Sequence, residues 1–95
     1  MDFPKILYLE MLPFYKRGGN MQTQYQEQYI KFGLKVQYYR KLRGLTQEAF
    51  AEEIGKSWSF VAKIESPTRA FGVSMETLFK IAEVLKVPVA HLFED

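Results

Sequence analysis

The sequence of 95 residues has few of the residues that support catalysis, metal binding or membrane insertion. It contains no cysteine and one histidine, which excludes disulfide bonds, zinc–thiolate sites and a cysteine nucleophile. It has no glycine-rich phosphate loop, and no apolar run approaches the roughly 20 residues that span a bilayer. We therefore expect no enzyme, cofactor, metal site or membrane segment, and a cytoplasmic protein.

The composition is that of one ordinary globular domain. Hydrophobic residues make up 47% and charged residues 25% of the chain, and the net charge of +2 is too small by itself to indicate a polyanionic partner. The distribution of charge is more informative. Between residues 31 and 69 the basic side chains are Lys31, Lys35, Arg40, Lys41, Arg43, Lys56, Lys63 and Arg69, and the acidic ones are Glu48, Glu52, Glu53 and Glu65. The first three of these acids share the outward face of one expected helix, so the remaining surface is more basic.

Apolar residues recur at helical spacing through most of the chain, and no strand or internal repeat is evident. The expected helices cover 23–43, 47–54, 57–65 and 74–86, and a final short helix has Pro88 in its first turn. Gly44 and Gly55 are placed to end the first two helices. The side chains suited to cap the next three helix starts are Thr46, Ser57 and Ser74. The pattern predicts an all-α domain of five helices over residues 23–95.

Residues 1–22 differ from the rest of the chain. Aromatic and aliphatic residues with two prolines precede the break Lys16–Asn20, and Met21 follows it. One hypothesis is that Met21 is the physiological start. The other, which we favour, is an N-terminal arm whose apolar residues between 3 and 14 cover the domain or a second subunit.

The stretch QEAFAEEIGKSWSFVAKIES, residues 47–66, is typical of two short helices joined at a glycine. At 100° per residue, Phe60, Val61 and Ile64 share one arc of the second helix. Trp58, Ser59 and Lys63 fall on the opposite arc together with Ala62 and Ser66. A helix with these two faces can pack on a small core and place its polar face in a DNA groove, so the stretch predicts a helix-turn-helix.

Several stretches in the same order extend this pattern: FGLKV, YRKLRGLTQEAFAEEIG, SWSFVAKIE, SMETLFKIAEVLKV and HLF. Over residues 32–93 the chain resembles the Cro/C1-type, or XRE-like, helix-turn-helix family of phage repressors and small bacterial regulators. The resemblance implies a five-helix bundle of the lambda-repressor type. It also implies a transcriptional repressor that binds the major groove of a palindromic operator in double-stranded DNA as a homodimer.

Position by position, the resemblance also implies site residues. The base-contacting candidates are Trp58, Ser59 and Lys63, and the phosphate-contacting candidates are Gln47 and Arg40. Further phosphate-contacting candidates, taken from their place in or beside the motif, are Arg43, Lys56, Ser57 and Arg69. Gln47 is expected to bind phosphate with its side chain and its amide at a helix start. Arg40 and Glu65 correspond to a partly buried salt bridge that joins the first helix to the end of the second motif helix. For Trp58 the alternative is an aromatic side chain folded back onto the domain or into a subunit interface.

One departure from the family pattern concerns the turn after the second motif helix. The family often has Asn-Gly and a basic residue there, whereas this chain has the run from Ser66 to Gly72, in which Pro67 has no amide to donate. We expect Thr68 or Arg69 to replace the phosphate contact of that turn.

A competing hypothesis is a protein-interaction module that keeps the fold without binding DNA. The acidic face at Glu48, Glu52 and Glu53 could contact RNA polymerase, or a toxin if the chain is the antitoxin of a pair. Lys63 distinguishes the two hypotheses. If intramolecular pairing neutralises its charge, the interaction hypothesis gains support.

Overall fold

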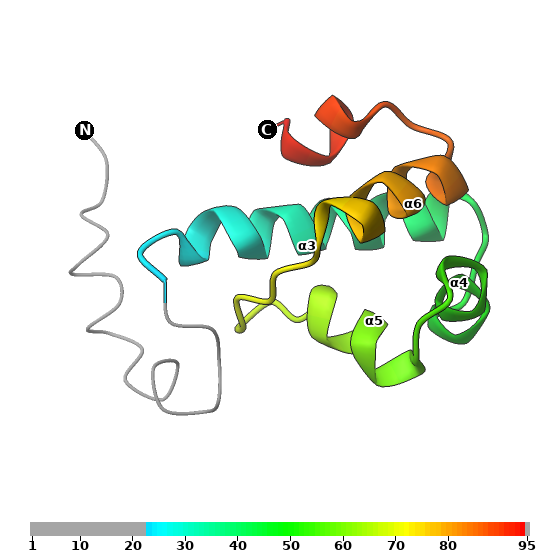
Figure 1. Cartoon of the computed structure of the whole chain (residues 1–95), viewed down its shortest axis with the longest axis horizontal. Coiled ribbons are helices and arrows are strands. Elements are labelled where there is room, and N and C mark those ends of the chain that lie inside the picture. Colours follow the sequence, from blue (N-terminus) through cyan, green and yellow to red (C-terminus); the bar gives the residue numbers. More distant parts are fainter. Residues whose placement is uncertain (1–22, 95) are drawn as a thin grey trace.

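A computed structural model describes residues 23–94, and the expected arm at residues 1–22 lies outside the described part. The elements are α3 (Gln26–Leu42), α4 (Gln47–Ile54), α5 (Trp58–Ile64), α6 (Met75–Leu85) and the 3-10 helix η1 (Val89–Phe93) (Figure 1). No strand occurs within residues 23–94. None of the described helices is both long and apolar enough to cross a bilayer. The all-α prediction is therefore confirmed for the described residues.

Side-chain caps define the starts of three helices. The hydroxyl of Thr46 accepts a hydrogen bond from the amide of Ala49 at 3.0 Å, and α4 begins at the next residue. Ser57 and Ser74 cap α5 and α6 in the same way, each at 3.1 Å. The three predicted N-caps are confirmed. Each hydroxyl satisfies an amide that has no partner inside the first helical turn.

The helix ends depend on residues in the left-handed conformation. Gly44 and Gly55 have φ of 74° and 73° at the ends of α3 and α4, where a side chain would strain the backbone. Lys86 ends α6 with φ of 61° although it is not glycine. The Arg43 guanidinium donates to the carbonyls of Leu85 at 2.6 Å and Lys86 at 3.2 Å. The end of α3 therefore caps the end of α6.

The last helix differs from the sequence prediction. Pro88 precedes η1 as its N-cap, and η1 is a 3-10 helix with the His91 amide bonded to the Pro88 carbonyl at 3.0 Å. Five residues are too few to build a regular α-helical hydrogen-bond ladder. Leu92 is fully buried, whereas Phe93 is 59% exposed. Leu92 is therefore the side chain by which η1 enters the core most deeply.

The core lies where α4, α5 and α6 pack on α3. Its fully buried large side chains are Val36, Phe50, Val61, Ile64, Ile81, Leu85 and Leu92. Phe60 is partly buried against this core, with its ring edge-on to that of Phe71 at 5.2 Å. The predicted apolar arc of α5 is thus its packing face. Because α4 and α5 have only 8 and 7 residues, this packing supplies most of their stability.

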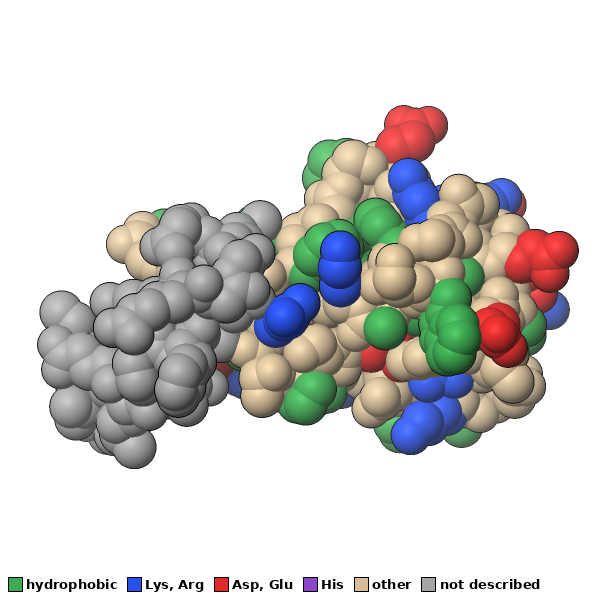
Figure 2. Space-filling view, turned by 90° about the horizontal axis from the view of Figure 1, so that it is seen from below, with side chains coloured by type: hydrophobic (Ala, Val, Ile, Leu, Met, Phe, Trp, Pro, Cys, Tyr) green, Lys and Arg blue, Asp and Glu red, His purple; other side chains and the backbone are tan. Residues whose placement is uncertain are grey.

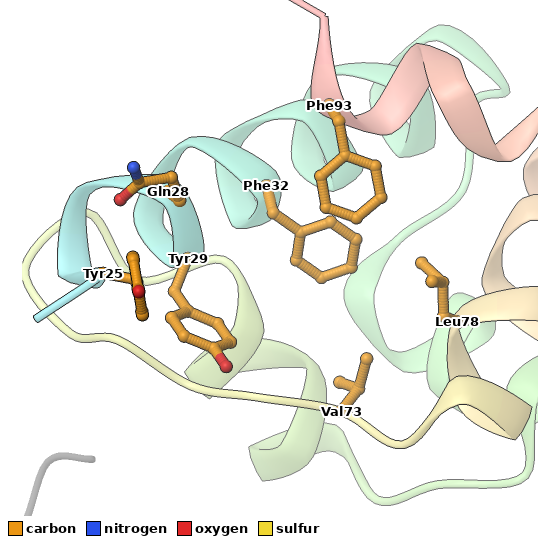
Figure 3. Close-up of a pocket in the computed structure, with 7 residues that line it drawn as sticks. All are labelled: Tyr25, Gln28, Tyr29, Phe32, Val73, Leu78 and Phe93. Carbon is orange, nitrogen blue, oxygen red and sulfur yellow. The ribbon is translucent and has the colours of Figure 1, made fainter. Parts of the chain in front are cut away.

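An apolar pocket of about 330 Å³ opens between the start of α3, the segment before α6 and η1 (Figure 3). Tyr29 and Phe32 line it from α3, Val73 and Leu78 from the opposite side. The ring of Phe93 stacks on that of Phe32 with centroids 5.3 Å apart. The exposed aromatic of η1 therefore continues the apolar surface of the pocket.

Gly33 sits where α3 meets the end of α5. A Cβ atom at this position would overlap the Ile64 carbonyl oxygen and stand 3.0 Å from the carbonyl carbon. Both opposing atoms belong to backbone, so neither can move without shifting a helix. Glycine is therefore required for α3 and α5 to approach this closely.

We expect Gly33→Ala to lower the free energy of unfolding by about 1–3 kcal/mol, because it overpacks this contact. In an unobstructed helix the same change would stabilise by about 0.5–1 kcal/mol. Urea denaturation followed by circular dichroism measures the difference. Lys41→Ala on the exposed surface of α3 is the control and should change little. A stabilised Gly33→Ala variant would contradict the close contact.

Candidate nucleic-acid interface

The first residues of α5 and its outer side form an exposed face. Val61 and Ile64 are buried on the inner side, whereas Trp58 is 57% exposed and Ser59 and Lys63 are exposed. In Figure 1, α5 lies at the lower edge of the molecule beside α4, with α3 and α6 above it. The three base-contacting candidates therefore lie together on the outer face of the molecule.

A buried ion pair holds the end of α5. Glu65 is 3% exposed and Arg40 of α3 is 6% exposed. Arg40 Nε and Nη2 donate to the two oxygens of Glu65 at 2.6 and 2.9 Å, and Arg40 Nη1 donates to the Leu45 carbonyl at 2.6 Å. This bidentate geometry fixes both the distance and the angle between α3 and the end of α5.

The ion pair continues to the protein surface through two side chains. Gln47 Nε2 donates to Glu65 Oε1 at 3.0 Å, and Trp58 Nε1 donates to Gln47 Oε1 at 2.9 Å. We refer to Arg40, Glu65, Gln47 and Trp58 as the polar chain. Gln37 of α3 also donates to Glu65 Oε1, at 3.4 Å. Sequence reasoning missed Gln37, because nothing in the sequence indicates the partner of a glutamine on a long helix.

The start of α4 retains donors for an anion. Thr46 caps the amide of Ala49, and the amide of Gln47 has no hydrogen-bond partner among residues 23–94. Amides in a first helical turn point outward and carry a partial positive charge. The backbone of Gln47 is thus available, whereas its side-chain oxygen and one N–H are already used within the polar chain.

Three of the phosphate-contacting candidates have structural roles. The Arg40 side chain is buried, and its Nε, Nη1 and Nη2 atoms all donate hydrogen bonds within the protein. Arg43 holds the end of α6. Ser57 caps α5, and its hydroxyl also lies 3.2 Å from that of Ser59. Internal contacts therefore already use hydrogen-bonding groups of all three side chains.

Three exposed cations lie on α5 or close to it in the sequence. Lys56 Nζ lies 5.2 Å from the Phe60 ring centroid and Lys63 Nζ lies 5.9 Å from that of Phe71. Neither they nor Arg69 forms an ion pair with any of residues 23–94. Figure 2 views the molecule from the α5 side and shows Lys and Arg side chains over this face, with acidic side chains toward the α4 edge.

In the turn after α5, polar groups of Ser66 and Thr68 form hydrogen bonds with each other. The Ser66 hydroxyl accepts from the Thr68 amide at 3.3 Å and lies 3.3 Å from the Thr68 hydroxyl. Pro67 between them has no amide. Arg69, which follows in the same turn, is exposed. Of the two residues suggested for a phosphate contact here, Arg69 has the donors available.

Comparison with known proteins gives a family match. A family model described as helix-turn-helix matches residues 36–92. HTH-type transcriptional regulators of Sinorhizobium medicae (strain WSM419) and Rhizobium meliloti (strain 1021) are each 33% identical over 66 residues, 70% of this chain and 46% of theirs. The chain spans less than half the length of these two relatives. A Methanocaldococcus jannaschii HTH-type transcriptional regulator is 36% identical over 59 residues, 62% of this chain and 86% of its own.

Solved structures share the fold. The restriction-modification controller protein C.AhdI from Aeromonas hydrophila matches with a TM-score of 0.61 and 32% identity, over 68% of this chain and 96% of its own. The master regulator for biofilm formation SinR, crystallised in complex with DNA, matches with a TM-score of 0.60 and 30% identity, over 66% of this chain and 98% of its own.

The buried ion pair predicts a non-additive double mutant. Arg40→Met leaves the Glu65 carboxylate buried without its cation and should cost about 3–5 kcal/mol of unfolding free energy. Arg40→Met with Glu65→Leu removes both charges and should cost clearly less. If Arg40→Met does not fold, the double variant is compared instead with Glu65→Gln, which keeps the size of the side chain and leaves the buried Arg40 cation without its carboxylate; the double variant should then be the more stable of the two.

Urea denaturation of the single and double variants measures the coupling energy. The matched control is the exposed pair Lys80 and Glu83 on α6, whose charged atoms are 3.8 Å apart. That pair should show a coupling of about 0–1 kcal/mol. Additive effects at Arg40 and Glu65 would show that the ion pair does not hold α5.

Proposed function

The chain belongs to the helix-turn-helix family of transcription regulators, in its Cro/C1 (XRE) type, and from this premise we propose that it is a sequence-specific repressor. It binds double-stranded DNA with α5 in the major groove. Repression is steric, since a protein bound at an operator blocks access to the promoter. A homodimer places two copies of α5 about 34 Å apart, one helical turn, on a palindromic operator.

The observation that carries this proposal is the outer face of α5. Its three candidate side chains are exposed, and Lys63 has no ion pair within residues 23–94. An ammonium with no internal counter-charge can donate to guanine O6 and N7 in the major groove. The same observation favours DNA binding over the interaction-only hypothesis, which would gain support from a neutralised Lys63.

Phosphate contacts orient α5 in the groove. The Gln47 amide at the start of α4 supplies one contact, because a helix N-terminus attracts anions. Lys56 before α5 and Arg69 after it supply two more, one on each side of the helix. The acids of α4, Glu48, Glu52 and Glu53, are exposed.

The dimer surface lies on the opposite side of the bundle. Phe93 is 59% exposed on η1 and adjoins the apolar pocket in Figure 3. Figure 1 shows η1 on the upper side of the molecule and α5 on the lower side. Contact through η1 therefore leaves both α5 helices open to DNA.

Selection of bound fragments from a random DNA pool tests the function, and we expect an enriched sequence with two-fold symmetry. On that duplex, Lys63→Ala should cost ~1–3 kcal/mol and relax preference at one base pair of each half-site. Arg69→Ala should weaken all sequences alike and reduce the salt dependence. Lys35→Ala, on the η1 side of α3, is the control for lost charge. Equal and uniform losses from Lys63→Ala and Arg69→Ala would contradict the assigned roles.

Sedimentation measures the proposed dimer. Phe93→Asp places a charge in the apolar contact and should raise the dimer dissociation constant at least about tenfold, the factor that corresponds to 1.4 kcal/mol. Leu42→Asp is the control, because Leu42 is 62% exposed at the far end of α3. Equal sedimentation of Phe93→Asp and the unmodified chain would place the dimer contact elsewhere.

A further inference from the structure

The outer face of α5 begins with an aromatic side chain whose polar hydrogen is already used. Trp58 is 57% exposed, yet its Nε1 donates to Gln47 Oε1 at 2.9 Å. An indole has a single donor and no acceptor. With that donor bonded inside the protein, the exposed part of Trp58 can offer only its carbon surface to a partner.

The chemistry of its neighbours determines this arrangement. Gln47 lies between Glu65 and Trp58, and a carboxylate only accepts while an indole N–H only donates. The amide of Gln47 must therefore turn its nitrogen to Glu65 and its oxygen to Trp58. Arg40 fixes Glu65 from the other side with hydrogen bonds of 2.6 and 2.9 Å. The orientation of the indole is thus set from the buried ion pair outward.

We propose that Trp58 recognises the C5 methyl group of a thymine in each half-site, and that Gln47 is its positioning residue. The inference rests on the proposed DNA-binding function and specifies what this position selects. In the major groove the thymine methyl is the apolar feature that distinguishes base pairs. A polar side chain at this place would favour a hydrogen-bonding base edge, whereas a ring with its N–H engaged favours the methyl group.

The experiment removes that methyl group and nothing else. In the duplex obtained by selection, each thymine is replaced singly by deoxyuridine, and affinity is measured with the full chain and with Trp58→Ala. We expect one position per half-site at which the unmodified chain binds about three- to tenfold more weakly, the effect of one methyl group leaving an apolar contact. Trp58→Ala should bind thymine and deoxyuridine equally at that position.

A second arm restores the methyl group on another base. At the same position, a pair containing 5-methylcytosine should bind more tightly than one containing cytosine, and this preference should vanish with Trp58→Ala. The two arms together separate recognition of a methyl group from recognition of thymine O4, which cytosine lacks.

The role of Gln47 has its own readout. Gln47→Leu cannot accept from the indole and should bring the thymine-to-deoxyuridine affinity ratio close to one. Gln37→Leu is the matched control, because Gln37 contacts the same Glu65 oxygen but not Trp58. It should leave the ratio unchanged. A general loss of stability or affinity cancels in this ratio, so a merely structural role of Gln47 would not move it.

The outcomes separate the two proposals. If a sequence is enriched but no thymine shows a loss that depends on Trp58, the methyl contact is refuted and the DNA-binding function stands. A methyl effect that persists in Trp58→Ala likewise overturns the assignment. Failure to enrich any sequence overturns both proposals.

Discussion

The position of α5 depends on one buried carboxylate. Glu65 follows the helix directly and is 3% exposed, so its charge must be matched inside the protein. Arg40 provides the charge from α3, and Gln47 provides a further donor from α4. Three helices therefore converge on two oxygen atoms. Because each hydrogen bond is directional, the convergence fixes the rotation of α5 as well as its place.

Close backbone packing adds a second constraint on the same helix end. Gly33 lets α3 approach the Ile64 carbonyl, one residue before Glu65. The Arg40–Glu65 ion pair draws α3 and the end of α5 together. The absence of a side chain at Gly33 leaves the space that this close approach requires. A seven-residue helix has little stability alone, so its exposed face is presented only while both contacts hold.

Local features of the structure were predictable from the sequence. The caps Thr46, Ser57 and Ser74 and the glycines 44 and 55 act within three or four residues, so their partners are fixed by short spacing. The apolar arc of α5 could be predicted because successive residues of an α-helix are rotated by 100°. The final helix was predicted less well, because five residues near Pro88 satisfy an α-helical and a 3-10 pattern equally.

The sequence by itself determined α4, α5 and α6 with their caps, the family and the side of α5 that packs, because each depends on residue types at short or family-specific spacings. Apart from the Arg40–Glu65 pair, which the family resemblance implied, only the tertiary structure decided which polar atoms of distant elements meet. Arg43 turned to the end of α6, 42 residues away, and Gln47 turned to Trp58 and Glu65. A hydrogen bond depends on angles and distances of a few tenths of an ångström, and these exist only once distant helices have packed.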